Sequence, residues 1–182
     1  MTAMPPSQRA NRAAWLCCHF TRNFAYYTAA MKHLPQDRGG LWLTLTGDLL
    51  DICVLEWCKL FGNKNGEYHW KKVTLDSASF LSSLLTPFRL SQTEFDAIYA
   101  ELKHYRDEFV AHTEESETTP VPALSTPYLL VSFLYERTLH DFPTLSGRDS
   151  LPTDLNSYYD EHLQEAEGEF AKIAHFRSSG TA

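Results

Sequence analysis

The 182-residue chain contains only four cysteines, and they form neither a C-x-x-C pair nor a zinc-finger pattern with histidine. Cys17, Cys18, Cys53 and Cys58 lie in apolar segments with helical spacing, where a free cysteine behaves as a small hydrophobic residue. We therefore expect buried, reduced thiols rather than disulfides or a zinc site. Such thiols are typical of a cytoplasmic protein.

Long apolar runs and common ligand-binding motifs are also missing. The most apolar stretch, residues 49–61, is interrupted by Asp51, Glu56 and Lys59, and no basic region with an apolar run opens the chain. We expect neither a signal peptide nor a membrane span. The sequence has no Walker phosphate loop, dinucleotide glycine motif, Gly-x-Ser-x-Gly elbow or His-Glu-x-x-His motif. No cofactor is therefore expected.

Positive charge is scarce overall, since 16 Lys and Arg face 23 Asp and Glu, for a net charge of -7. The imbalance begins after His112: the segment up to that residue has a charge of +1, and the rest has -8. This composition argues against a broadly basic nucleic-acid-binding surface. An anionic ligand is expected to meet the first segment.

Apolar residues recur at steps of three and four, which predicts amphipathic helices, and no segment alternates as a strand would. Five main helices are predicted near residues 13–34, 41–61, 95–109, 125–142 and 155–173, with a short one at 76–85. Asp76 is a plausible N-cap, and Ser91 and Glu94 have capping-box spacing. The predicted fold is all-α, an antiparallel bundle of about five main helices.

The whole chain, residues 1–182, is predicted to form a single domain, with residues 1–8 and 178–182 disordered. The very apolar helix at 41–61 is expected to be central. After it, residues 62–72 form a loop that mixes basic and aromatic residues. Contact with nucleic acid is one interpretation, but we expect Trp70 to pack on the domain and the lysines to be solvated. Residues 113–123 are expected to be a solvated acidic connector.

Arg106 stands out because it falls on the apolar side of its helix. A turn of about 100° per residue, counted from Phe95, places Arg106 at about 20°. This angle falls on the apolar face formed by Ile98, Tyr99, Leu102 and Phe109. A guanidinium there needs a carboxylate, a phosphate or a wet cleft. His112 lies about 240° further round. From this pattern alone, an internal ion pair for Arg106 and a helix-dipole role for His112 are favoured.

Two histidine patterns in the same segment raise the question of a metal site. Glu101 and His104 have the spacing used in di-iron bundles, but no second copy of that motif occurs. His104, Glu108 and His112 recur at every fourth position. Such a row is more often the polar flank of a helix than a set of ligands. We therefore expect no metal.

The spacing of Arg106 and His112 near the end of a late helix resembles the signature of the HEPN superfamily (higher eukaryotes and prokaryotes nucleotide-binding). The wording Tyr-Arg-Asp-Glu-Phe-Val-Ala-His-Thr at 105–113, with Glu-Trp-Cys-Lys-Leu-Phe-Gly at 56–62, is similar to the branch associated with abortive-infection U-type phage resistance. The resemblance covers roughly residues 10–175 and implies a HEPN-like bundle.

In that family two bundles usually dimerise so that their Arg-His motifs face a shared cleft, and many members are metal-independent endoribonucleases. The resemblance implies that the 2'-hydroxyl of RNA attacks the adjacent phosphate, with His112 moving the proton, Arg106 stabilising charge and Asp107 orienting the pair. It further implies a cytoplasmic homodimer that acts on RNA, as a toxin or phage-defence effector, with an antitoxin or other protein partner. The alternative is a non-catalytic HEPN module that binds a nucleotide or a protein.

Overall fold

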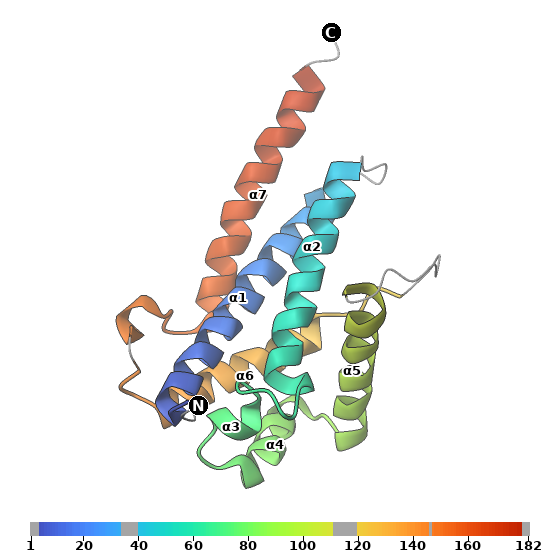
Figure 1. Ribbon diagram of the computed structural model, residues 1–182. Coiled ribbons are helices and arrows are strands. Elements are labelled where there is room, and N and C mark those ends of the chain that lie inside the picture. The colour runs from blue at the N-terminus through green and yellow to red at the C-terminus, as the bar shows by residue number, and fades with distance from the viewer. Residues whose placement is uncertain (1–3, 34–39, 111–119, 146, 180–182) are drawn as a thin grey trace.

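The computed structural model describes residues 4–33, 40–110, 120–145 and 147–179, and all regular structure in these ranges is helical (Figure 1). The five long helices are α1 (Pro6–His33), α2 (Gly40–Trp57), α5 (Gln92–Tyr105), α6 (Ser125–Asp141) and α7 (Leu155–Ser179). The shorter helices are α3 (Trp70–Val73) and α4 (Ser77–Leu85), with 3-10 turns η2 (Thr86–Phe88) and η4 (Arg148–Ser150). Two π-helical turns, η1 (Cys58–Gly62) and η3 (Arg106–Val110), continue α2 and α5. The all-α prediction with five main helices is confirmed.

The central helix is α1, and the prediction that the helix at 41–61 would be central is wrong. Helix α1 packs against α2, α6 and α7. It can do so because its buried positions are mostly small, so that three neighbours approach its backbone closely. Its fully buried small residues are Ala10, Ala13, Ala14, Cys17, Cys18, Ala25, Ala29 and Ala30. The start of α2, in contrast, leaves Leu41 and Leu43 exposed.

The bundle is antiparallel for α1 with α2, but α1 and α7 run in the same direction (Figure 1). Tyr26 donates a hydrogen bond to Glu165 at 3.0 Å, and Lys32 further along α1 pairs with Glu167 at 2.6 Å. The long connection between α6 and α7 permits this arrangement, since only short loops force neighbouring helices to be antiparallel. The antiparallel prediction therefore needs this correction.

Local signals in the sequence correctly marked several helix starts. Asp76 accepts a hydrogen bond from the Ser79 N–H at 3.2 Å, and Ser91 and Glu94 form the expected capping box. Helix α1 begins at Pro6, so part of the 1–8 segment predicted to be disordered is helical, because proline is well suited to the first helical turn. Helix α7 likewise runs to Ser179, so residues 178 and 179 of the predicted disordered tail are helical. Residues 1–3 and 180–182 lie outside the described residues.

The predicted loop after α2 contains the short helix α3, which the apolar spacing did not indicate. Trp70 is buried and stacks on Phe80 with ring centroids 5.1 Å apart, as expected from the packing interpretation. His69 is also buried, and its ring accepts from the Lys71 N–H and donates to the Phe61 carbonyl, 3.2 Å away. The loop is therefore tied back to the end of η1.

All four cysteines are free and buried, as predicted. The predicted acidic connector, residues 113–123, lies mostly outside the described residues, because 111–119 are not described. Within the described part of the chain, no helix combines the length and apolar composition that crossing a membrane requires.

Candidate functional site

The candidate site lies where α2 and α5 end in π-helical turns. In η1 the Asn63 N–H donates to the Cys58 carbonyl at 2.8 Å, the i to i+5 bond that defines a π turn. The turn η1 contacts α5, and η3 contacts α2. Each π turn therefore lies against the other helix of the pair. Single π turns of this kind are frequent at functional sites in proteins.

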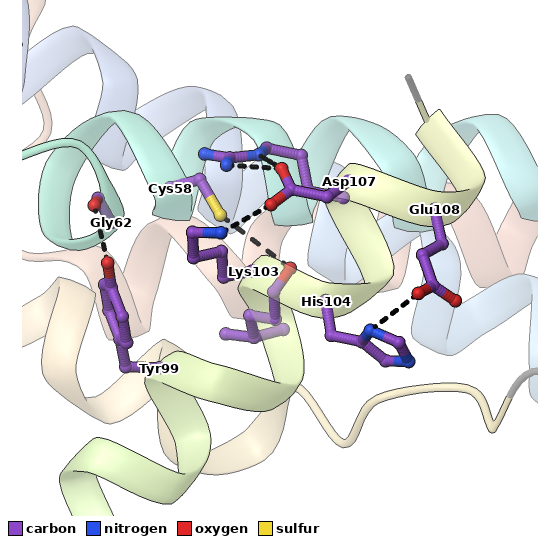
Figure 2. A network of polar contacts seen from close by, with 9 residues as sticks. Cys58, Gly62, Tyr99, Lys103, His104, Asp107 and Glu108 are labelled. Carbon is purple, nitrogen blue, oxygen red and sulfur yellow. Dashed lines mark hydrogen bonds and ion pairs between the residues drawn. The ribbon is translucent and has the colours of Figure 1, made fainter. Parts of the chain in front are cut away.

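Three contacts from side chains hold α5 and η3 against α2 and η1. They run from Tyr99 to the Gly62 carbonyl (3.2 Å), from Cys58 to the Leu102 carbonyl (3.9 Å) and from Tyr105 to the Asp51 carboxylate (2.9 Å). Figure 2 shows the first two side by side. The order of the partners is antiparallel. These contacts bring the two sequence segments that carry the HEPN resemblance, 56–62 and 105–110, into one place.

Arg106 projects toward η1 rather than into the hydrophobic core. Its side chain is 26% exposed, and its Nε donates to Oδ1 of Asp107 at 2.8 Å. The Nη2 group of Arg106 bonds the same oxygen. The guanidinium is thus half-buried and has an internal carboxylate partner, as the position of Arg106 on the apolar face of its helix led us to expect. Asp107 does not shield it completely from solvent.

Asp107 joins two cations. Its Oδ2 accepts a hydrogen bond from Lys103 at 2.6 Å, while Oδ1 accepts from Arg106 (Figure 2). The hydrogen bond from Lys103, followed by that from Arg106, holds the pKa of Asp107 below its usual value. An ideal α-helix would point Asp107 away from the stripe of Arg106. The long Arg106 side chain nevertheless reaches the carboxylate of Asp107, the next residue along the chain.

A hollow of about 400 Å³ opens beside the Arg106 guanidinium. It is lined by Gly62, Asn63, Lys64, Asn65, Tyr99, Lys103 and Arg106. Three cationic residues and two asparagines therefore line one cavity. Asp107 is the carboxylate that bonds two of these cations, Lys103 and Arg106. Cationic and amide donors arranged in this way suit a phosphate group.

Gly62 lines this hollow from the η1 side, and the buried Cys58 lies next to it. A Cβ placed on Gly62 would lie 3.3 Å from Cβ of Cys58 and 4.0 Å from Nη1 of Arg106. Burial raises the pKa of Cys58 to about 11, an effect that Arg106 partly offsets. Cys58 therefore stays a neutral thiol at neutral pH, and it acts as packing rather than as a nucleophile.

His104 and Glu108, the described members of the histidine row, point away from Asp107. His104 is exposed and pairs with Glu108 at 3.1 Å, on a different side of the helix from Asp107 (Figure 2). Among the described residues, no three His, Cys, Asp or Glu side chains gather as metal ligands would. The polar-flank interpretation of His104 and Glu108 agrees with this pairing.

His112, the predicted proton carrier, lies outside the described residues, since residues 111–119 are not described. Of the three predicted site residues, the structure therefore describes Arg106 and Asp107 and brings them into direct contact. Sequence reasoning missed Lys103 and Lys64. Lys103 had a usable signal, because it precedes Asp107 by four residues and such pairs face each other on a helix. Lys64 had none, because its position depends on how the loop folds back.

Comparison with models of protein families, with curated proteins and with solved structures found no match to this chain.

Proposed function

We propose that this protein is a metal-independent endoribonuclease of the HEPN type, acting as a toxin or phage-defence effector in the cytoplasm. The observation that carries the proposal is the cationic hollow at the paired π turns, where Arg106 and Lys103 flank Asp107. This hollow lies in the positively charged part of an otherwise acidic chain. Local positive potential of this kind attracts a phosphate even when the net charge is negative.

In the proposed reaction, the 2'-oxygen of RNA attacks the adjacent phosphorus and the bond from phosphorus to the 5'-oxygen breaks. The products are a 2',3'-cyclic phosphate and a 5'-hydroxyl. His112 takes the proton from the 2'-hydroxyl or delivers one to the leaving 5'-oxygen. Arg106 stabilises the negative charge on the phosphate. Asp107 holds Arg106 and Lys103 in position through the two hydrogen bonds described above.

The proposed active form is a homodimer in which two such hollows share a cleft. Exposed apolar residues on α2 support it, because Leu41, Leu45 and Ile52 lie on one face of that helix and are all exposed to solvent. Leu41 is 74% exposed, so Leu41→Glu should leave the monomer fold intact. We expect this variant to shift the mass measured by light scattering toward the monomer and to reduce cleavage. Leu75→Glu, at a residue 69% exposed outside α2, is the matched control.

The decisive experiment is cleavage of total cellular RNA by purified protein in EDTA, with end-group analysis of the products. We expect cleavage with cyclic-phosphate ends, lost in both Arg106→Ala and His112→Ala. Arg137→Ala is a matched control. Arg137 is a similarly half-buried arginine, 34% exposed, that pairs with Asp141 at 2.9 Å and lies on α6, outside the candidate site. His140→Ala is the control for the histidine. Undiminished cleavage in the two site variants would refute the proposal.

A second function, a non-catalytic HEPN module that binds a nucleotide or a partner protein, is favoured by the occupied state of Arg106. Two of its donors already bond Asp107, which leaves fewer of them to stabilise the charge that develops on a reacting phosphate. Tight binding of RNA or nucleotide without turnover would select this function. An antitoxin or another protein partner would then be the natural regulator of the complex.

A further inference from the structure

A second hollow of about 420 Å³ adjoins the cationic one, with which it shares Lys64 and Tyr99 as lining residues. Its floor consists of buried aromatic residues: Phe61, Trp70 and Phe95. Phe61 and Phe95 pack edge to face, with ring centroids 6.3 Å apart, and Trp70 is fixed from behind by Phe80. These rings are held in place by their neighbours and give the hollow an aromatic lining, which suits a heteroaromatic ring.

The rim of this second hollow is polar, and its acceptors come from the start of α5. Gln92 donates a hydrogen bond to Oδ1 of Asp96 at 2.9 Å, which fixes the orientation of that carboxylate. Asp96 is exposed on the rim. A carboxylate accepts hydrogen bonds only, and two neighbouring N–H donors on one edge of a ring are its best match. Among the RNA bases, guanine presents such a pair, at N1 and N2.

The two hollows are joined by shared residues. Lys64 and Tyr99 line both of them, and the Lys64 ammonium lies 5.9 Å from the centre of the Tyr99 ring. The Tyr99 hydroxyl donates a hydrogen bond to the Gly62 carbonyl, which holds the Tyr99 ring in place. A nucleotide that straddles this ring would place its base on the aromatic floor and its phosphate beside Lys103 and Arg106.

We propose that the second hollow is a guanine site, in which Asp96 accepts hydrogen bonds from N1 and N2 of the base while Lys64 bridges to the phosphate. The substrate class is then RNA with guanosine next to the bound phosphate. This inference rests on the proposed function for its phosphate, but the base contacts involve different residues. Gln92 is a positioning residue, because it holds Asp96 and need not touch the base itself.

Calorimetric titration of the full chain with the four nucleoside 3'-monophosphates and the four 5'-monophosphates tests this site. In at least one series we expect the guanosine form to bind about tenfold more tightly than the other three, because one good bidentate contact supplies that discrimination. Asp96→Asn should abolish the preference, and Lys64→Gln should weaken all four nucleotides alike. Asp160→Asn, the same change at an exposed position on α7, should behave as the wild type.

The absence of any guanosine preference in both series, or a preference that survives in Asp96→Asn, would overturn the guanine site. These results are separable from the fate of the proposed reaction. RNA cleavage that requires Arg106 but ignores base identity would remove the guanine site alone. A guanosine preference that depends on Asp96, with no RNA cleavage in any condition, would keep the guanine site and leave the protein as a binding module.

Discussion

The Tyr105 hydroxyl donates a hydrogen bond to Oδ1 of Asp51 at 2.9 Å, and so fixes the start of η3 to the middle of α2. Desolvation raises the pKa of the Asp51 carboxyl, which the hydrogen bond from Tyr105 partly offsets. Tyr105 immediately precedes Arg106. The direction in which the guanidinium leaves the helix therefore depends on this contact.

Tyr105→Phe should lower the free energy of unfolding by about 1 kcal/mol, because a part-buried carboxylate loses a donor. Urea denaturation of Tyr105→Phe, Asp51→Ala and the double variant would measure the coupling between the two side chains. We expect a clearly favourable coupling energy. If the two single effects simply add, the contact does not stabilise the fold.

Gly62→Ala and Gly47→Ala make the same change in one continuous helical segment, with opposite expected signs. A Cβ at Gly47 meets nothing within 4 Å, so this variant should gain about 0.5–1 kcal/mol of stability from helix propensity. A Cβ at Gly62 lies tightly against Cys58, and the variant should lose about 1 kcal/mol by overpacking. Thermal unfolding compares the stabilities of the two variants. A stabilised Gly62→Ala would show that η1 shifts to accommodate the added methyl group at little cost.

Among the described residues, Asp107 is the carboxylate that bonds both Lys103 and Arg106, and Asp107→Asn removes its charge. We expect RNA to bind more tightly, by about two- to tenfold at low salt, because the hollow becomes more positive. The cleavage rate at saturating RNA should nevertheless fall, because Arg106 and Lys103 lose their common anchor. Filter binding and single-turnover kinetics give the two values separately. Weaker binding together with slower cleavage would argue that Asp107 has only a structural role.

His69 makes the stability of the fold depend on pH. Desolvation lowers its pKa to about 4, below the ordinary value of 6.5, although its bond to Phe61 opposes the shift. Between these values the unfolded chain binds more protons, so stability is lost as the pH falls from 6.5 toward 4, by at most about 1.4 kcal/mol per pH unit. Above 6.5 the contribution is fully present.

Urea unfolding across this pH range, in wild type and His69→Gln, measures the contribution of His69. Glutamine keeps a donor for the Phe61 carbonyl but does not titrate, so its stability should fall less steeply with acid. Equal slopes in wild type and His69→Gln would place the titration elsewhere.

Helix positions followed from the sequence because apolar spacing and capping residues act locally, as at Asp76 and Ser91. The choice of central helix did not follow from the sequence, because it depends on which helix lets its neighbours pack closely against its backbone. The small residues of α1, among them Ala13 and Cys17, decided that outcome. The site was predicted in part: Arg106 was identified by a charge on an apolar face. For Asp107 the two arguments disagreed: the family resemblance implied that it orients the pair, whereas regular helix geometry pointed it away from Arg106.

Each π turn encloses one residue more than an α turn, so the site differs from an uninterrupted helix pair by a single amino acid on each side. Deleting one residue between Cys58 and Gly62 would restore regular α-helix, rotate the Gly62 wall and redirect the loop that carries Lys64. The corresponding deletion after Tyr105 would turn the following side chains to another face. In genetic terms, the loss of one codon in either helix would be enough to remove the π turn on that side. The cationic hollow is correspondingly easy to lose.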